Sequence, residues 1–207
     1  MQSVLSYQAY GRNILLKIKE CSNPLFLLGL LIKIILIFSL APEAAVNWYV
    51  PFLQNSIDHF TISPWDSWIE NGGSKDNFPY GYVLWLVFLP LTLIFDSFSL
   101  SQNIAYGLTL ILIDFALLSV FRKLNDIRVS LLLFCYWLSP IIIYTTYIVG
   151  LNDLVPVFFL TLSLYFQKQQ KLFKAGFFLI AAISAKFSMI LAVPFFIIHL
   201  YKNEQIY

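Results

Sequence analysis

One loop of this sequence, between about residues 42 and 79, gathers acidic and aromatic side chains. Its carboxylates are those of Glu43, Asp58, Asp66, Glu70 and Asp76, and Trp48, Trp65 and Trp68 lie among them. A carboxylate at a water–lipid boundary can act as a general base towards a hydroxyl group. The loop acids are therefore candidates for proton transfer.

Attack of a hydroxyl group on a sugar linked through phosphate requires a base for the proton and a cation for the leaving phosphate. The loop acids supply the first kind of group, and Lys186 is the candidate for the second. It follows a small-residue stretch, 181–185, of the kind that permits close helix packing. In a cavity formed there, its ammonium group could meet a phosphate.

Ionisable residues inside apolar segments are costly and are functional candidates by default. They are Lys33, Asp114, Asp153 and Lys186. Lys33 could extend to the interface or pair with an acid. Asp114 could pair with a cation from another helix as readily as take part in catalysis.

The elements that position these residues are strongly apolar. The chain has 207 residues, 59% of them hydrophobic and 12% charged, with a mean hydropathy of +0.77. A soluble domain has about 25% charged residues. We therefore expect an integral, multi-spanning membrane protein, and the net charge of +2 is too small to indicate a nucleic-acid partner.

The hydropathy pattern predicts an all-α fold, a transmembrane helical bundle of about six hydrophobic segments. The segments are 24–40, 82–95, 104–121, 129–149, 154–166 and 175–200, the last as one long or two broken helices. Short amphipathic pieces at 48–60 and 64–69 are expected to lie on the membrane surface. Residues 1–207 then form one transmembrane module, with a first span at 24–40, an outer loop at 42–79 and the remaining spans at 80–200.

Basic residues predict the orientation. The N-terminus and the clusters 122–128 and 168–174 are expected on the cytoplasmic side, of either a plasma or an endoplasmic-reticulum-type membrane, with the outer loop opposite. If both 82–95 and 104–121 cross fully, however, Arg122 falls on the outer side. A re-entrant hairpin at 82–95, which contains Pro90, would remove the conflict, and both topologies stay open.

Other ligand chemistries have little support in the sequence. Cys21 and Cys135 predict neither a disulfide nor a metal site, and His59 and His199 are expected at the interface. No cofactor is indicated. A divalent metal among the loop acids is conceivable, but their spacing specifies none.

A series of short motifs follows the loop in a characteristic order. They are Phe78-Pro79-Tyr80-Gly81-Tyr82, Ile113-Asp114-Phe115, Leu138-Ser139-Pro140, Gly150-Leu151-Asn152-Asp153 and Ala182-Ile183-Ser184-Ala185-Lys186-Phe187. In this order, the chain resembles the N-terminal part of polyprenol-phosphate-sugar-dependent glycosyltransferases of the GT-C superfold, over roughly residues 24–200.

This resemblance implies transfer of mannose, glucose or a similar sugar from a polyprenyl phosphate to a glycan or lipid acceptor on the outer face. The family's base is an acid early in the first loop. Here Asn47 stands about where an aspartate is expected, so the candidates are Glu43 first, then Asp66, Asp58 and Asp76. The residues expected to face the donor sugar and phosphate are Asn152, Asp153 and Lys186, with Tyr80 beside them.

Such enzymes are usually about twice this length, so a partner chain supplying further C-terminal spans is one expectation from the resemblance. Two other interpretations compete with a transferase. One is a non-catalytic membrane subunit or scaffold of the same ancestry. The other is a small transporter or lipid flippase, in which Lys33 and Asp114 would line a path.

Overall fold

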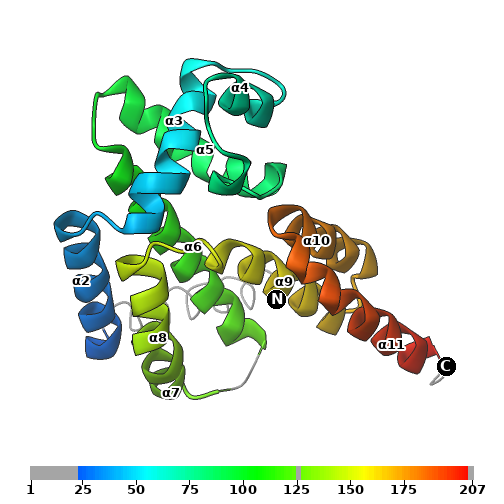
Figure 1. Cartoon of the computed structure of the whole chain (residues 1–207). Coiled ribbons are helices and arrows are strands. Elements are labelled where there is room, and N and C mark those ends of the chain that lie inside the picture. The colour runs from blue at the N-terminus through cyan, green and yellow to red at the C-terminus, as the bar shows by residue number, and fades with distance from the viewer. Residues whose placement is uncertain (1–22, 125–126, 205–207) are drawn as a thin grey trace, which may run out of the picture.

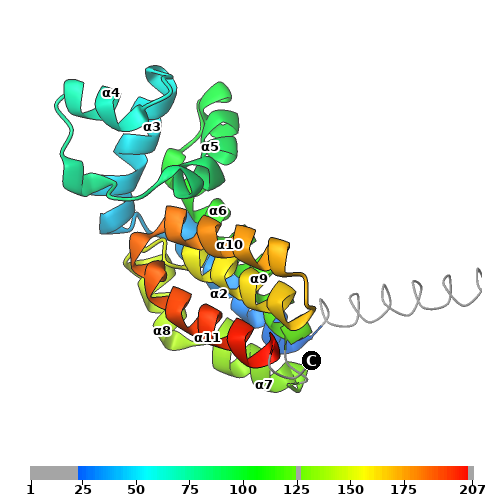
Figure 2. The same cartoon turned by 90° about the vertical axis from the view of Figure 1, so that its right-hand side faces the viewer.

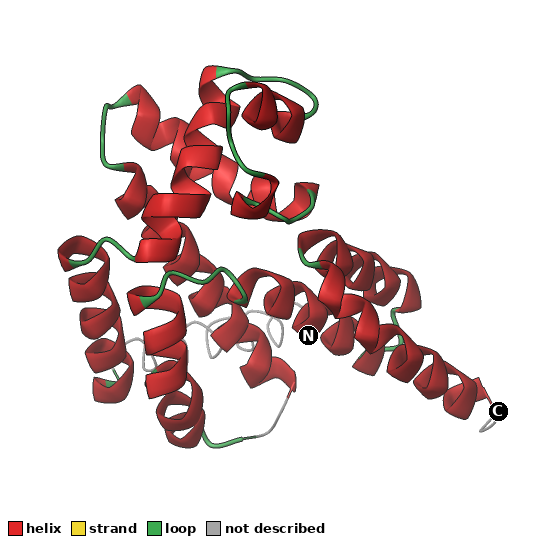
Figure 3. Ribbon diagram, in the orientation of Figure 1, coloured by secondary structure: helices red, strands yellow, loops and turns green. Residues whose placement is uncertain are grey.

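The computed structural model describes residues 23–124 and 127–204, and every regular element within these ranges is a helix (Figure 3). This confirms the all-α prediction. The helices form two tiers (Figure 1). The upper tier, which we call the cap, comprises residues 42–97, and the lower tier is a bundle of longer apolar helices.

The cap contains short helices followed by one longer helix. They are η1 (Ala45–Tyr49), α3 (Val50–Asp58), α4 (Pro64–Glu70), η2 (Lys75–Asn77) and α5 (Tyr82–Ser97). The bundle contains α2 (Pro24–Ser39), α6 (Gln102–Leu124), α7 (Val129–Leu132), η3 (Leu133–Trp137), α8 (Pro140–Ile143), η4 (Tyr144–Ile148), α9 (Leu154–Lys168), α10 (Leu172–Ala185), η5 (Phe187–Ala192) and α11 (Val193–Glu204). Figure 2 shows the cap at one end, with α9, α10 and α11 running away from it.

Two helices are long and apolar enough to cross a membrane, namely Gln102–Leu124 with 23 residues and Val129–Ile148 with 20. Five more apolar helices contain 10–17 residues. A helix along the bilayer normal needs about 20 residues, because each residue adds about 1.5 Å. The lengths therefore identify two candidate spans among the described residues.

Helix α2 begins and ends where its sequence directs. Pro24 occupies the first helical turn, and the Leu25 N–H donates to Asn23 Oδ1 at 2.9 Å. Both features favour a helix start. At the other end the chain leaves the helix at Leu40, which is extended and directly precedes the loop.

Helices α2 and α6 are antiparallel. Phe26, at the start of α2, packs with Leu118 near the end of α6 and with Leu133 in η3, whereas Ile37 packs with Ile111 and Tyr147. The start of α2, the end of α6 and the start of α7 therefore lie together, at what we call the basal end, opposite the cap.

Helix α5 belongs to the cap and does not carry the chain to the basal end. Gly81, directly before it, lies against the backbone of Ser184. Near its other end, Asp96 accepts a hydrogen bond from Gln54 of α3 at 2.8 Å. Residues 82–95, for which a full crossing and a re-entrant hairpin were both open, form one helix that is continuous through Pro90. This proline lies on the exposed side of α5 and leaves the buried side intact.

Stacked aromatic rings form the core between the cap and the bundle. Phe52 and Phe78 stack at 4.2 Å between ring centroids, and Phe88 and Tyr106 stack at 4.7 Å. All four side chains are buried. Because Tyr106 belongs to α6, this aromatic core fixes the cap onto the bundle.

Candidate functional site

The turn after η4 fixes the start of the cap loop. Gly150 has a φ of +88°, which L side chains rarely adopt, and an added Cβ would stand 2.7 Å from the Pro42 side chain. The Tyr106 hydroxyl donates to the Gly150 carbonyl oxygen at 2.8 Å. The Ala44 N–H donates to the Val149 carbonyl oxygen at 3.3 Å. The loop start and the 150–153 turn are therefore held together.

The segment containing Lys186 joins this turn from α10. Helix α10 ends at Ala185, and Lys186 is extended, with φ −149° and ψ 117°, before the chain enters η5. The predicted stretch 175–200 is thus two helices broken at Lys186. This break lies beside Gly81, because Gly81 is packed against the Ser184 carbonyl oxygen so closely that a Cβ would overlap it.

Lys186 and Asp153 form an ion pair that solvent reaches. The Lys186 Nζ donates to Asp153 Oδ1, and the two side chains keep 33% and 48% of their surface exposed. The Lys186 Nζ also lies 5.9 Å from the centroid of the Tyr80 ring. Three predicted donor-site residues, Tyr80, Asp153 and Lys186, therefore come together at the junction of cap and bundle.

Two further tyrosines lie behind this pair. The hydroxyls of Tyr49 and Tyr80 are 3.1 Å apart, and the Tyr49 and Tyr106 rings stack at 5.8 Å. Burial, the hydrogen bond to Tyr80 and the nearby negative charge of Asp153 all raise the pKa of Tyr49. Tyr49 is therefore a neutral phenol that can donate a hydrogen bond throughout the physiological pH range.

Asn152, the fourth predicted donor-site residue, lies under the turn beside Asp153. Its side chain is 1% exposed, and neither its amide nitrogen nor its amide oxygen makes a hydrogen bond of good geometry within the described residues. Buried amides usually have such partners. Asn152 lies close to the Tyr106 side chain, and its amide keeps hydrogen-bonding capacity for a further partner.

A groove of about 410 Å³ opens next to the ion pair and shares Tyr80 with it. Its lining residues are Trp65, Trp68, Ile69, Lys75, Phe78, Pro79, Tyr80, Gly81 and Tyr82. The Trp65 and Trp68 indole N–H groups donate to the carbonyl oxygens of Phe78 and Ser74, at 3.0 and 2.9 Å. These bonds hold the indoles in place, so the groove is preformed and mainly apolar.

The four acids predicted as bases do not gather around Lys186. Glu43, Asp58, Asp66 and Asp76 are all exposed. Glu43 belongs to the loop segment that is bonded to the end of η4, because the N–H of its neighbour Ala44 donates to the Val149 carbonyl oxygen. Asp58, at the end of α3, accepts from Gln54 at 3.2 Å. The carboxylate that pairs with Lys186 is that of Asp153.

The structure offers no metal site in its described part. Within residues 23–124 and 127–204, no three side chains of the histidine, cysteine, aspartate and glutamate types lie close enough together to hold an ion. The loop acids are dispersed over α3, α4 and η2, which accounts for this.

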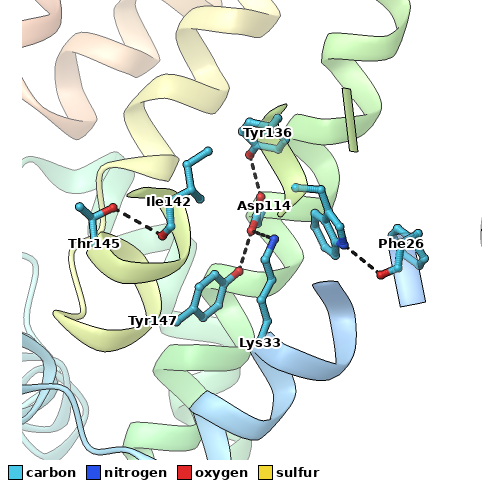
Figure 4. Close-up of polar contacts among 8 residues, drawn as sticks. Phe26, Lys33, Asp114, Tyr136, Ile142, Thr145 and Tyr147 are labelled. Carbon is cyan, nitrogen blue, oxygen red and sulfur yellow. Dashed lines mark hydrogen bonds and ion pairs between the residues drawn. The ribbon is translucent and has the colours of Figure 1, made fainter. Parts of the chain in front are cut away.

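Lys33 and Asp114 form a second, sealed ion pair within the bundle. Their Nζ–Oδ2 distance is 2.7 Å and both side chains are 0% exposed. Asp114 also accepts bonds of 2.7 Å from the Tyr136 and Tyr147 hydroxyls, and the Lys33 Nζ lies 3.2 Å from the Trp137 ring centroid. Figure 4 shows the lysine and both tyrosines converging on Asp114.

Sequence reasoning missed Tyr49, Tyr106 and Gly150 as parts of this junction. Tyr49 and Tyr106 are separated by more than fifty positions, and their stacking depends on how the cap sits on α6. The glycine-polar-polar-acid order of 150–153 was a signal for the turn, but it did not indicate that Gly150 contacts Pro42.

Comparison of the chain with protein-family models, curated proteins and solved structures finds no match.

Proposed function

We propose that this chain is a membrane glycosyltransferase, or the N-terminal module of one, that takes a hexose from a polyprenyl-phosphate donor. One observation carries the proposal. A half-exposed Lys186–Asp153 ion pair lies at the junction of cap and bundle, beside a preformed aromatic groove. Such a transfer needs three parts. They are a cation for the phosphate, a carboxylate for the proton and an apolar groove for the sugar ring.

In the proposed reaction, an acceptor hydroxyl oxygen attacks the anomeric carbon of the donor sugar. The new glycosidic bond forms as the bond between that carbon and the phosphate oxygen breaks. The hydroxyl proton passes to a carboxylate, and polyprenyl phosphate leaves with the bonding electron pair. The Lys186 ammonium stabilises the negative charge of the leaving phosphate.

The junction offers two carboxylates for the proton. Asp153 is already beside Lys186, and binding of a donor phosphate to the ammonium would release it from the ion pair. Glu43 is exposed on the loop segment that is bonded to the same turn. Asp58, Asp66 and Asp76 remain lower-ranked candidates for the base.

The aromatic groove suits a pyranose ring. The C–H groups of a sugar face are weakly positive, whereas the face of an aromatic ring is negative, so the two attract each other. The volume of about 410 Å³ is within the range of small-ligand sites. Lys75 at the groove supplies a charged hydrogen-bond donor for sugar hydroxyls.

The proposed membrane arrangement has about six hydrophobic segments, with the cap on the outer side. Helices of 10–17 residues are shorter than the hydrocarbon core of a typical bilayer. They would cross it only if the bilayer is thinned locally or if the polar residues at the junction of cap and bundle complete the path. Because α5 stays within the cap and α6 returns to the basal end, Arg122 lies at the same end as the start of α2. This arrangement agrees with basic residues on the cytoplasmic side, including a cytoplasmic N-terminus.

The transporter alternative has less support, because Lys33 and Asp114 are fully buried and their charged groups are paired with each other. A transport path needs polar groups that water or substrate can reach. The scaffold alternative is addressed by the experiment below.

Native mass spectrometry of the full chain, purified in mild detergent with added C55 polyprenyl phosphate, tests the proposal. We expect Lys186→Gln to weaken binding about ten- to hundredfold, since it removes a charged hydrogen bond to phosphate. Arg128→Gln, an exposed cation at the basal end, is the matched control and should bind as wild type. Equal binding by wild type and Lys186→Gln would refute the donor site and favour a scaffold.

A further inference from the structure

At the basal end, α9 is tied to the end of α6. The Lys168 Nζ donates to the Leu124 carbonyl oxygen at 2.7 Å. Leu124 is the last residue of α6, and its carbonyl group has no partner within the helix. The bond therefore brings the basic turn between α9 and α10 next to the basic end of α6.

Four lysines from these segments surround the end of α9. The Lys123 Nζ lies 5.8 Å from the Tyr165 ring centroid, and the Lys174 Nζ lies 5.5 Å from the Phe166 ring centroid. Lys171 donates to Gln169 Oε1 at 2.9 Å. We call Lys123, Lys168, Lys171 and Lys174 the basal lysine cluster, and all four side chains are exposed.

The charge of the basal lysine cluster is not neutralised within the described residues. No described carboxylate forms an ion pair with any of its members, whereas Lys33 and Lys186 each have an aspartate partner. In the cap, by contrast, carboxylates predominate. Four exposed ammonium groups with no acidic partner in the described part of the chain make this end a strong local attractor for anions.

Large apolar side chains border the cluster. Phe173, between Lys171 and Lys174, is 88% exposed, and Leu172 and Phe177 are 47% and 59% exposed. A small soluble anion makes no favourable contact with exposed apolar side chains. A phospholipid does, because it carries a phosphate next to hydrocarbon chains. Lysines whose stems lie along apolar surface, with their charges at its edge, match the boundary between headgroups and acyl chains.

From this combination we infer that the basal lysine cluster is a binding site for the headgroups of anionic phospholipids. The lysines from α6, α9, the α9–α10 turn and the first turn of α10 hold headgroup phosphates, and Phe173 lies among the acyl chains. This site is remote from the Lys186–Asp153 junction and does not depend on the proposed transferase function.

Lipid retention by the full chain tests the inference. The protein would be placed in nanodiscs of equal parts phosphatidylglycerol and phosphatidylcholine, extracted in mild detergent, and its retained lipids identified by native mass spectrometry. We expect wild type to retain phosphatidylglycerol preferentially. The double variant Lys171→Gln/Lys174→Gln should reduce that preference roughly tenfold, because each lysine near an anionic surface contributes separately.

Two control variants isolate the cause. Lys171→Arg/Lys174→Arg keeps both charges and should retain phosphatidylglycerol as wild type does. Lys75→Gln removes an exposed lysine from the cap, away from the cluster, and should leave the preference for phosphatidylglycerol unchanged. Equal retention of the two lipids by wild type, or undiminished preference in the double glutamine variant, would overturn the inference. Displacement of the lipid by inorganic phosphate at the same concentration would overturn it too, since the site would then recognise a free anion.

Discussion

The Lys33–Asp114 pair shows how a charge is accommodated inside an apolar bundle. Asp114 accepts three hydrogen bonds of 2.7 Å, from Lys33, Tyr136 and Tyr147. The donors come from α2, η3 and η4, whereas Asp114 is on α6. The Lys33–Asp114 pair and its two tyrosines therefore join four helical elements of the bundle, and their role is one of assembly.

Asp114→Asn should lower the free energy of unfolding by about 3–5 kcal/mol, because it leaves the Lys33 ammonium buried without a counter-charge. Thermal unfolding in detergent, followed by tryptophan fluorescence, measures the effect. The double variant Lys33→Met/Asp114→Leu should recover part of the loss, since it removes both charges but leaves two tyrosine hydroxyls without their acceptor. A single variant that melts as wild type does would contradict this assignment.

At the scale of elements, close packing of α2 on η3 decides how the first helix sits. Trp137 is 0% exposed, stacks on Phe26 at 5.1 Å between ring centroids, and donates its indole N–H to the Phe26 carbonyl oxygen at 3.0 Å. Its ring lies directly over Gly29, where an added Cβ would overlap it. Only glycine at position 29 lets these two elements approach this closely.

Gly29→Ala should therefore destabilise the protein by about 1–3 kcal/mol, the usual cost of overpacking a tight contact. Gly176→Ala is the matched control, because it lies within α10 and an added Cβ meets nothing within 4 Å. That control should be neutral or stabilising by up to about 1 kcal/mol, since alanine favours a helix. Equal melting temperatures for both variants would show that the α2–η3 contact adjusts freely.

Across the whole molecule, charge is distributed unevenly. The cap carries Glu43, Asp58, Asp66, Glu70, Asp76 and Asp96, whereas the basal end carries Lys123, Arg128, Lys168, Lys171 and Lys174. Between them lie apolar helices with many exposed large hydrophobic side chains. This is the distribution expected of a bundle that has water at both ends and lipid around its middle.

Cysteine accessibility in sealed vesicles tests this arrangement. In a background lacking Cys21 and Cys135, Ile62→Cys in the cap and Ser130→Cys near the basal end should react with a membrane-impermeant maleimide from opposite sides. Ile62 is 93% exposed and Ser130 is also exposed, so both are reachable. Labelling of both from the same side of intact vesicles would contradict a cap and a basal end on opposite faces.

Composition and periodicity by themselves determined the all-α class and the start of α2, because these depend on local propensity and on apolar burial. They left 175–200 open between one long helix and two, and only the structure located the break at Lys186. The resemblance carried by the motif order implied that Tyr80, Asn152, Asp153 and Lys186 would face one donor, and the structure brings Tyr80, Asp153 and Lys186 together. The number of full membrane crossings was not determined, since helix lengths alone identify two candidate spans.

Only the tertiary structure decided which charges pair and where α5 lies. Asp114 faces Lys33 because α2 and α6 pack antiparallel, a contact 81 positions apart that no local pattern encodes. Asp153, rather than a loop acid, faces Lys186 because the 150–153 turn and the end of α10 meet beneath the cap. Likewise, α5 stays in the cap because aromatic stacking holds it against α3 and α6, whereas its hydropathy matched that of a membrane span.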